Sequence, residues 1–134
     1  MIAVDTSVVV AAFASWHEGH AGAAATLARR PRVPAHVLLE TYSVLTRLPP
    51  PHRAPATLVA AFLGERFSSP PLVLPGAEHA RLVARAAETG IVGGSIHDAL
   101  VAATVRHAGA RLLTRDRRAA PTYERLGVEF ELIA

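Results

Sequence analysis

The sequence opens on Ile2-Ala3-Val4-Asp5-Thr6-Ser7, a short apolar run that ends in an aspartate and two hydroxyl residues. An apolar run without polar alternation predicts a strand that is buried on both faces. Thr6 and Ser7 are placed to cap a helix over residues 8–14. The later stretch Arg111-Leu112-Leu113-Thr114-Arg115-Asp116 repeats the pattern, with a strand over 111–114 that leads to an aspartate. We therefore predict two buried strands with an acid just beyond the carboxyl end of each.

Helical and strand patterns alternate along the rest of the chain. Helices are predicted at 19–29, 37–48, 57–67, 78–89, 95–108 and 121–126, and further strands at 72–74 and 128–133. The segment 33–35 is too short and too proline-broken to predict a strand. Short apolar strands that alternate with helices indicate an α/β fold, in which helices cover both faces of a short, mainly parallel sheet. The length of 134 residues favours a single domain over 1–134.

Composition narrows the function classes. The chain has no cysteine, which excludes a disulfide framework, a thiol nucleophile and a zinc–cysteine site. All 14 basic residues are arginine, and the absence of lysine argues against phosphoryl transfer through Asp5. A net charge of +3 is compatible with a polyanionic partner. No apolar run approaches the ~20 residues of a membrane helix, and no basic region precedes the first one, so we expect a cytoplasmic protein without membrane contact.

Four acids are the candidate functional residues. Asp5 and Asp116 follow strands, Asp98 lies in the first turn of a helix, and Glu40 lies inside an apolar helix. Because ligands bind outside the carboxyl ends of parallel strands, we expect the three aspartates at one edge of the sheet. Converging carboxylates repel one another unless a hard cation lies among them.

Each of these acids also has a plain structural interpretation. Asp5 fits the N-cap of the helix that follows it, and Ser95 with Asp98 fits a capping box. Asp116 fits an Asx turn after a strand, and Glu40 fits a surface position beside a buried stripe. These interpretations are independent of one another, and none explains why every aspartate of the chain falls at the same edge.

Four segments together resemble the PIN-domain ribonucleases, and most closely the toxins of VapBC-type toxin–antitoxin pairs. The matching segments are residues 2–7, Glu40 in the third predicted helix, residues 97–103 and residues 112–116. They occur in order and extend over the chain, so the resemblance implies a PIN-like three-layer α/β/α sandwich. The stretch around Pro49-Pro50-Pro51 carries no family signature and leaves the choice of substrate open.

The resemblance implies a metal-dependent endoribonuclease toxin that hydrolyses RNA phosphodiesters and so inhibits translation. The catalytic residues, which would also bind Mg²⁺ or Mn²⁺, would be Asp5, Glu40, Asp98 and Asp116. Thr6 and Thr114 would orient carboxylates through their hydroxyls, although strand-end or capping roles remain open for both. The implied partners are a VapB-like antitoxin and RNA, in a homodimer or a toxin–antitoxin hetero-oligomer.

Basic and aromatic residues complete the expectations. Three arginines bracket Asp116 in the sequence: Arg115, Arg117 and Arg118. We predict that they contact RNA phosphates. The alternative is an ordinary run of solvated surface charges. Aromatic residues make up only 5% of the chain, so base stacking is not predicted. Trp16, the single tryptophan, is assigned to the core or to a partner contact, and His17 to the surface.

The competing function class is a regulatory protein that binds RNA without cutting it and whose acids hold a structural cation. Two enzyme motifs fail on spacing: His17-Glu18-Gly19-His20 is not a zincin motif, and residues 93–97 lack the final glycine of a nucleophile elbow. Cleavage that requires Mg²⁺ and disappears in EDTA would separate a nuclease from a binder.

Overall fold

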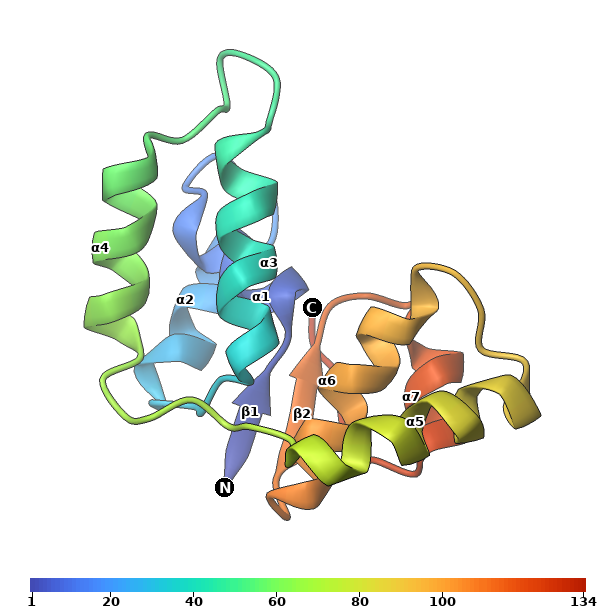
Figure 1. Ribbon diagram of the computed structural model, residues 1–134. Coiled ribbons are helices and arrows are strands. Elements are labelled where there is room, and N and C mark those ends of the chain that lie inside the picture. Colours follow the sequence, from blue (N-terminus) through green and yellow to red (C-terminus); the bar gives the residue numbers. More distant parts are fainter.

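A computed structural model, which covers residues 1–134, places a short parallel sheet between layers of helices (Figure 1). The strands are β1 (Ile2–Val4), β2 (Arg111–Thr114) and β3 (Phe130–Leu132), in the spatial order β1-β2-β3. Both pairings are parallel, with Ile2 opposite Arg111 and Leu112 opposite Phe130. All three strands therefore end at the same edge, which brings the segments after β1 and β2 together.

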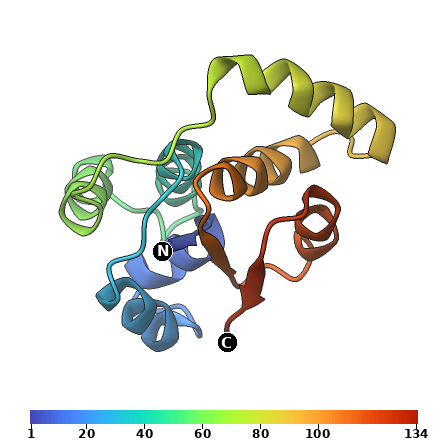
Figure 2. The ribbon, with the colours of Figure 1, turned by 90° about the horizontal axis from the view of Figure 1, so that it is seen from below.

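Seven helices connect and cover the strands. They are α1 (Thr6–Phe13), α2 (His20–Ala28), α3 (Ala35–Thr46), α4 (Ala56–Arg66), α5 (Gly76–Thr89), α6 (Ser95–His107) and α7 (Ala120–Leu126). Seen from below, α1 and α2 lie on one face of the sheet and α6 and α7 on the other (Figure 2). This arrangement is the three-layer α/β/α sandwich that the sequence predicts.

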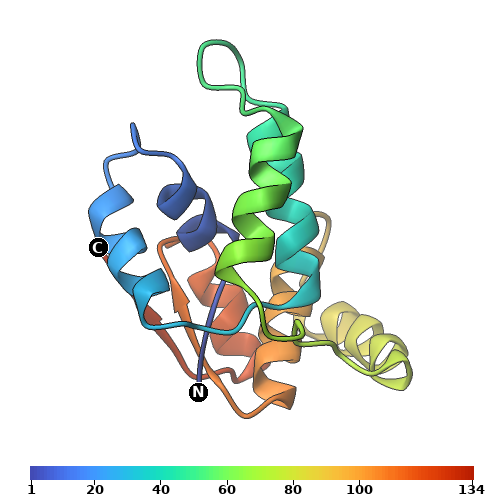
Figure 3. The same ribbon diagram turned by 90° about the vertical axis from the view of Figure 1, so that its left-hand side faces the viewer.

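The long helices α3 and α4 stand side by side and rise beyond the sheet (Figure 3). One face of α3 is buried through Val37, Thr41 and Leu45, which recur at helical spacing. The loop that joins α3 to α4 and the loop that joins α1 to α2 both lie at the end of the molecule where β1 and β2 finish (Figures 1 and 3).

The interior is formed by 30 buried apolar residues in one connected cluster. It includes Val4 and Leu113, which the sequence predicts to be buried in strands, and Val101 and Val105 on α6. Gly90 and Gly127 end α5 and α7 in the left-handed conformation, with φ of 73° and 70°. None of the helices combines the length and the apolar character that crossing a membrane requires.

The structure corrects three details of the predicted elements. Residues 72–74 form no strand, because Leu72 makes only an isolated parallel bridge with Pro34. Pro34 has no N–H to donate, and α3 begins at Ala35, so this pairing has no length over which to extend. The last strand is shorter than 128–133. Asp5, and not Thr6 or Ser7, is the N-cap of α1, since its carboxylate accepts from the backbone N–H of Ser7.

Candidate active site

A cavity of about 400 Å³ opens where β1 and β2 end, and all four candidate acids line it. Asp5 follows β1, Asp116 lies two residues beyond β2, Asp98 lies in the first turn of α6, and Glu40 projects from α3. Glu40, Asp98 and Asp116 are each partly exposed. Four separate elements thus deliver carboxylates to one place, as expected for acids placed at the carboxyl edge of a parallel sheet.

Asp5 lies deepest, with 4% of its surface exposed. One carboxylate oxygen accepts from the Ser7 hydroxyl at 2.5 Å and from the Ser7 backbone N–H at 3.1 Å. The other accepts from the hydroxyls of Thr114 and Tyr123, the latter at 2.7 Å. Asp5 is therefore the helix cap that a plain structural interpretation expects, and it is also a wall of the cavity. Each oxygen accepts two hydrogen bonds, which fixes the orientation of the buried carboxylate.

Hydroxyl groups tie the ends of β1 and β2 together. Thr114 donates to Asp5 and accepts from the backbone N–H of Asp116 at 3.0 Å. The Ser7 hydroxyl accepts from the backbone N–H of Arg115 at 2.8 Å. These bonds hold the segment that carries Asp116 against the segment that carries Asp5, so the spacing between the two acids is set by the strand ends.

Thr6 serves a different acid. Its hydroxyl donates to Glu40 at 3.2 Å and so connects α1 to α3 across the cavity. The other side of Glu40 faces His36, whose Nε2 lies 3.5 Å from the same carboxylate oxygen. The ring of His36 stacks in parallel on His97, at 5.0 Å between ring centroids. One oxygen of Glu40 thus has two polar neighbours, Thr6 and His36, which accounts for a carboxylate on the flank of an apolar helix.

The electrostatics of the cavity reflect crowding among the acids. Burial raises the pKa of Asp98 to about 6, with further contributions from the charges of Asp116, Glu40 and Asp5. Burial also raises the pKa of Asp5, against the opposing effect of its hydrogen bonds. The pKa of Tyr123 is raised by burial and by the charge of Asp5, so its hydroxyl stays protonated and donates.

The three predicted phosphate-binding arginines are not equivalent. Arg115 and Arg118 line the cavity, whereas Arg117 does not. Arg118 lies 3.6 Å from Asp116, and its backbone N–H donates to that carboxylate at 2.9 Å, which is the Asx turn of the structural interpretation. Arg115 lies over Gly19, where its guanidinium occupies the space that a Cβ would need. Arg115 therefore connects β2 to the loop before α2.

The donor set fits a hard divalent cation, although the acids and histidines form no preassembled group of three metal ligands. Mg²⁺ and Mn²⁺ prefer carboxylate oxygens and retained waters, and the cavity offers carboxylates from four elements without a thiol. The raised pKa of Asp98 has the repulsion among these acids as one of its causes, and a cation would relieve that repulsion.

Sequence patterns did not identify Ser7 or Tyr123 as site residues or place His17 at the cavity. Ser7 was interpreted as a helix cap, although its position two residues after an acid is also typical of a side-chain turn. Tyr123 reaches Asp5 across 118 positions of sequence, and no local pattern signals a contact of that range. His17 lies in the loop between α1 and α2 and lines the cavity, whereas the sequence only placed it at the surface.

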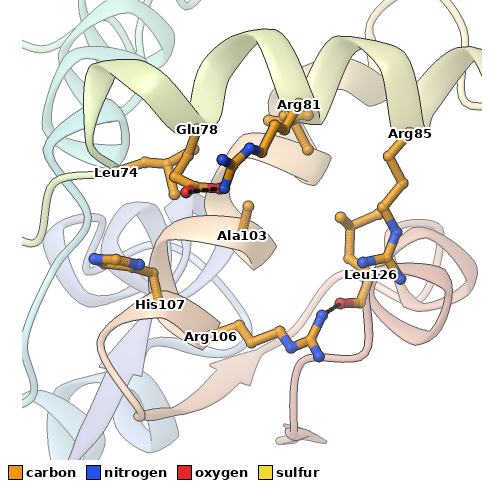
Figure 4. A pocket seen from close by; sticks show the side chains of 9 residues that line it. Leu74, Glu78, Arg81, Arg85, Ala103, Arg106, His107 and Leu126 are labelled. Atoms are coloured by element: carbon orange, nitrogen blue, oxygen red, sulfur yellow. Dashed lines mark hydrogen bonds and ion pairs between the residues drawn. The ribbon is translucent and has the colours of Figure 1, made fainter.

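A second cavity, of about 410 Å³, lies between α5, α6 and α7 (Figure 4). Arg85 on α5 donates to the carbonyl of Arg125, and Arg106 on α6 donates to the carbonyl of Leu126. These guanidiniums connect α5 and α6 to the end of α7. None of the four acids lines this cavity, so its basic lining is separate from the candidate site.

Comparisons with known proteins agree with this geometry. The PIN domain family matches residues 2–125. The chain is 53% identical over 133 residues to Ribonuclease VapC40 of Mycobacterium tuberculosis, covering 99% of both chains. The fold is similar to that of Mycobacterium tuberculosis VapC20, a toxin that cleaves the sarcin–ricin loop, with a TM-score of 0.70, 23% identity and coverage of 90% of this chain and 94% of that one.

A further similar fold comes from a toxin–antitoxin complex. The match is to the crystal structure of VapBC2 from Rickettsia felis bound to a DNA fragment from its promoter, with a TM-score of 0.68, 15% identity and full coverage of both chains. At this identity the likeness concerns the fold alone. The family match over most of the chain and the full-length relative at 53% identity decide the assignment: the chain belongs to the PIN-domain family, among the VapC-type ribonuclease toxins.

Proposed function

We propose that this protein is a Mg²⁺- or Mn²⁺-dependent endoribonuclease that hydrolyses RNA phosphodiesters at the acidic cavity and thereby inhibits translation. The observation that carries the proposal is the meeting of Asp5, Glu40, Asp98 and Asp116 in one cavity, delivered by four elements that are distant in sequence. The plain structural interpretations, a capping box, an Asx turn and a helix cap, each explain the position of one aspartate. They do not explain why all four acids line the same cavity.

Different residues of the cavity would bind the cation and hold the carboxylates in position. Glu40, Asp98 and Asp116 are partly exposed and line the cavity, so they are placed to bind the cation from different sides. Asp5 is the most rigid of the four, because Ser7, Thr114 and Tyr123 hold its carboxylate. Thr6 orients Glu40. The chemistry that a bound cation supplies is polarisation of the scissile phosphate and a lower pKa for the attacking water.

Arg115 and Arg118 supply the positive charge that an RNA backbone needs at a cavity lined by acids. Arg118 lies beside Asp116, so a phosphate that contacts Arg118 is brought next to that carboxylate. The two arginines thus bind and orient the substrate strand. Arg117 is exposed and does not line the cavity, and its contact with an RNA phosphate stays a prediction.

The proposal includes a protein partner. Since the chain belongs to the VapC-type toxins and a similar fold is that of a VapBC complex, we expect a VapB-like antitoxin, and a homodimer or a toxin–antitoxin hetero-oligomer as the assembly. The four acids of the cavity give a basic antitoxin segment a complementary surface to recognise.

The test is cleavage of total cellular RNA by the purified protein, with Mg²⁺ or with EDTA, beside the variant Asp116→Asn. Asparagine keeps the oxygen that accepts from the backbone of Arg118 and removes the charge. We expect discrete products from the parent in Mg²⁺, none in EDTA and at least a hundred-fold less from the variant, by analogy with loss of a group that acts on the transition state. RNA that is shifted on a gel but intact in Mg²⁺ would instead identify a non-cleaving RNA-binding regulator.

A further inference from the structure

Trp16 lies at the surface and not in the core. Its side chain is 50% exposed, although large aromatic side chains are usually well buried. Its ring packs against that of His52 in a tilted arrangement, with the ring centroids 4.0 Å apart and the planes 32° apart. Trp16 belongs to the loop between α1 and α2, and His52 to the loop between α3 and α4. The contact therefore joins two loops at the end of the molecule where β1 and β2 finish (Figures 1 and 3).

The loop that carries Trp16 is also a wall of the acidic cavity. His17 lines the cavity, and its ring centroid lies 5.9 Å from that of Trp16. His17 is held in place, because its Nδ1 accepts from the backbone N–H of Gly19 at 2.9 Å. Gly19 in turn packs under the guanidinium of Arg115. The Trp16 ring therefore neighbours the cavity through His17, which belongs to its lining.

The surroundings of Trp16 suit a nucleobase better than a protein partner. The rings next to it are imidazoles, and the neighbouring Ser15 and Glu18 are polar and exposed. The core of a protein interface is depleted of charged residues, whereas the exposed Glu18 lies two positions from Trp16 in the same loop. Single-stranded RNA requires planar side chains on which unpaired bases stack, next to positive charge that follows the backbone.

We infer that Trp16, supported by His52, is a base-stacking subsite for an unpaired nucleotide next to the phosphate that enters the acidic cavity. This inference rests on the proposed function and adds one contact to it, that of the Trp16 ring with an unpaired base next to the cleaved phosphate. Stacking is tolerant of base identity, so the subsite contributes affinity and placement and does not read sequence.

The experiment uses the full chain carrying Asp116→Asn, so that bound RNA stays intact, and follows the emission of Trp16, the only tryptophan. The probes are a short adenylate single strand, a short uridylate single strand and a fully paired RNA duplex. Both single strands should quench the emission, at the same concentrations at which labelled RNA is seen to bind. The duplex should quench little, because its bases are already stacked.

Three variants in the same background measure the contribution of the ring. Trp16→Leu should weaken single-strand binding roughly ten-fold, as expected for the loss of one stacked base. Trp16→Phe keeps a ring and should recover most of the affinity. The matched control is Tyr42→Ala, which removes a similarly exposed aromatic side chain, 44% accessible, that takes no part in the ring contacts among Trp16, His17 and His52. Its RNA affinity should equal that of the parent.

Unchanged emission at saturating RNA, or equal affinity of Trp16→Leu and its parent, would overturn the inference. Normal RNA binding by Trp16→Leu with loss of antitoxin binding would also overturn it and assign the ring to a protein contact. Failure of the proposed function looks different: the wild-type chain would cut no RNA in Mg²⁺ while the quench and the ten-fold loss persisted.

Discussion

Thr114 has a hydroxyl that serves two partners at once. It donates to the buried carboxylate of Asp5 and accepts from the backbone N–H of Asp116, and its side chain is fully buried. Thr114→Val keeps the shape and removes both bonds, so the buried Asp5 carboxylate keeps only the bond from Tyr123 on that oxygen and the backbone N–H of Asp116 loses its partner. We expect a loss of about 2 kcal/mol in the free energy of unfolding, measured by urea denaturation, and weaker RNA cleavage.

Thr104→Val is the matched control for Thr114→Val. Thr104 is also buried, but its hydroxyl donates only to the carbonyl of Leu100 within α6. That carbonyl belongs to the helix ladder, so the substitution should cost much less stability and leave cleavage intact. Thr114→Ser, which keeps the hydroxyl, should retain most of the activity. Equal losses in the two valine variants would show that Thr114 has no special part in holding the acids.

The segment between β2 and α7 carries two neighbouring arginines, of which only one lines the cavity. Arg118 is 95% exposed at its side chain and lines the cavity beside Asp116, whereas neighbouring Arg117 does not line it. If Arg118 contacts an RNA phosphate, Arg118→Gln should reduce the slope of log affinity against log salt by roughly one unit. Arg117→Gln removes the same charge and should leave the slope nearly unchanged.

Filter binding over a range of salt concentrations, with the cleavage-disabled Asp116→Asn chain as parent, makes this comparison. The result separates a directed contact from the general attraction of a basic surface. Equal changes in slope for the two glutamine variants would assign both arginines to an ordinary solvated charge run.

For the whole molecule, the sequence predicts the sheet and the positions of the acids, but it does not predict the hydrogen bonds that hold the acids in place. Short apolar runs ending near Asp5 and Asp116 suffice, because parallel strands finish at one edge and so bring those segments together. The contact between Tyr123 and Asp5 has no local signature, since it depends on how α7 packs against the sheet. The predicted strand at 72–74 is absent because Pro34 limits its only partner to a single bridge.

The most direct test of the acidic cavity as a metal site is thermal melting. The parent protein and Asp98→Asn are each melted in EDTA and in Mg²⁺. At about pH 8, above the pKa of about 6 for Asp98, the Asp98 carboxylate is ionised and is repelled by the charges of the acids around it. A carboxyl whose pKa is raised on folding lowers stability progressively as the pH rises from its ordinary value of 3.8 to the raised value, and the full loss is present above it. Asp98→Asn should therefore melt no lower than the parent in EDTA.

Mg²⁺ should then separate the two proteins. The parent should gain about 2.7 kcal/mol when the ion is at a hundred times its dissociation constant, and Asp98→Asn should gain much less because a ligand is missing. The control is Glu88→Gln, which removes a charge from an exposed position on α5 outside the cavity lining. Mg²⁺ should stabilise this variant as much as it stabilises the parent. Equal Mg²⁺ shifts in the parent and in Asp98→Asn would contradict the acidic cavity as a metal site.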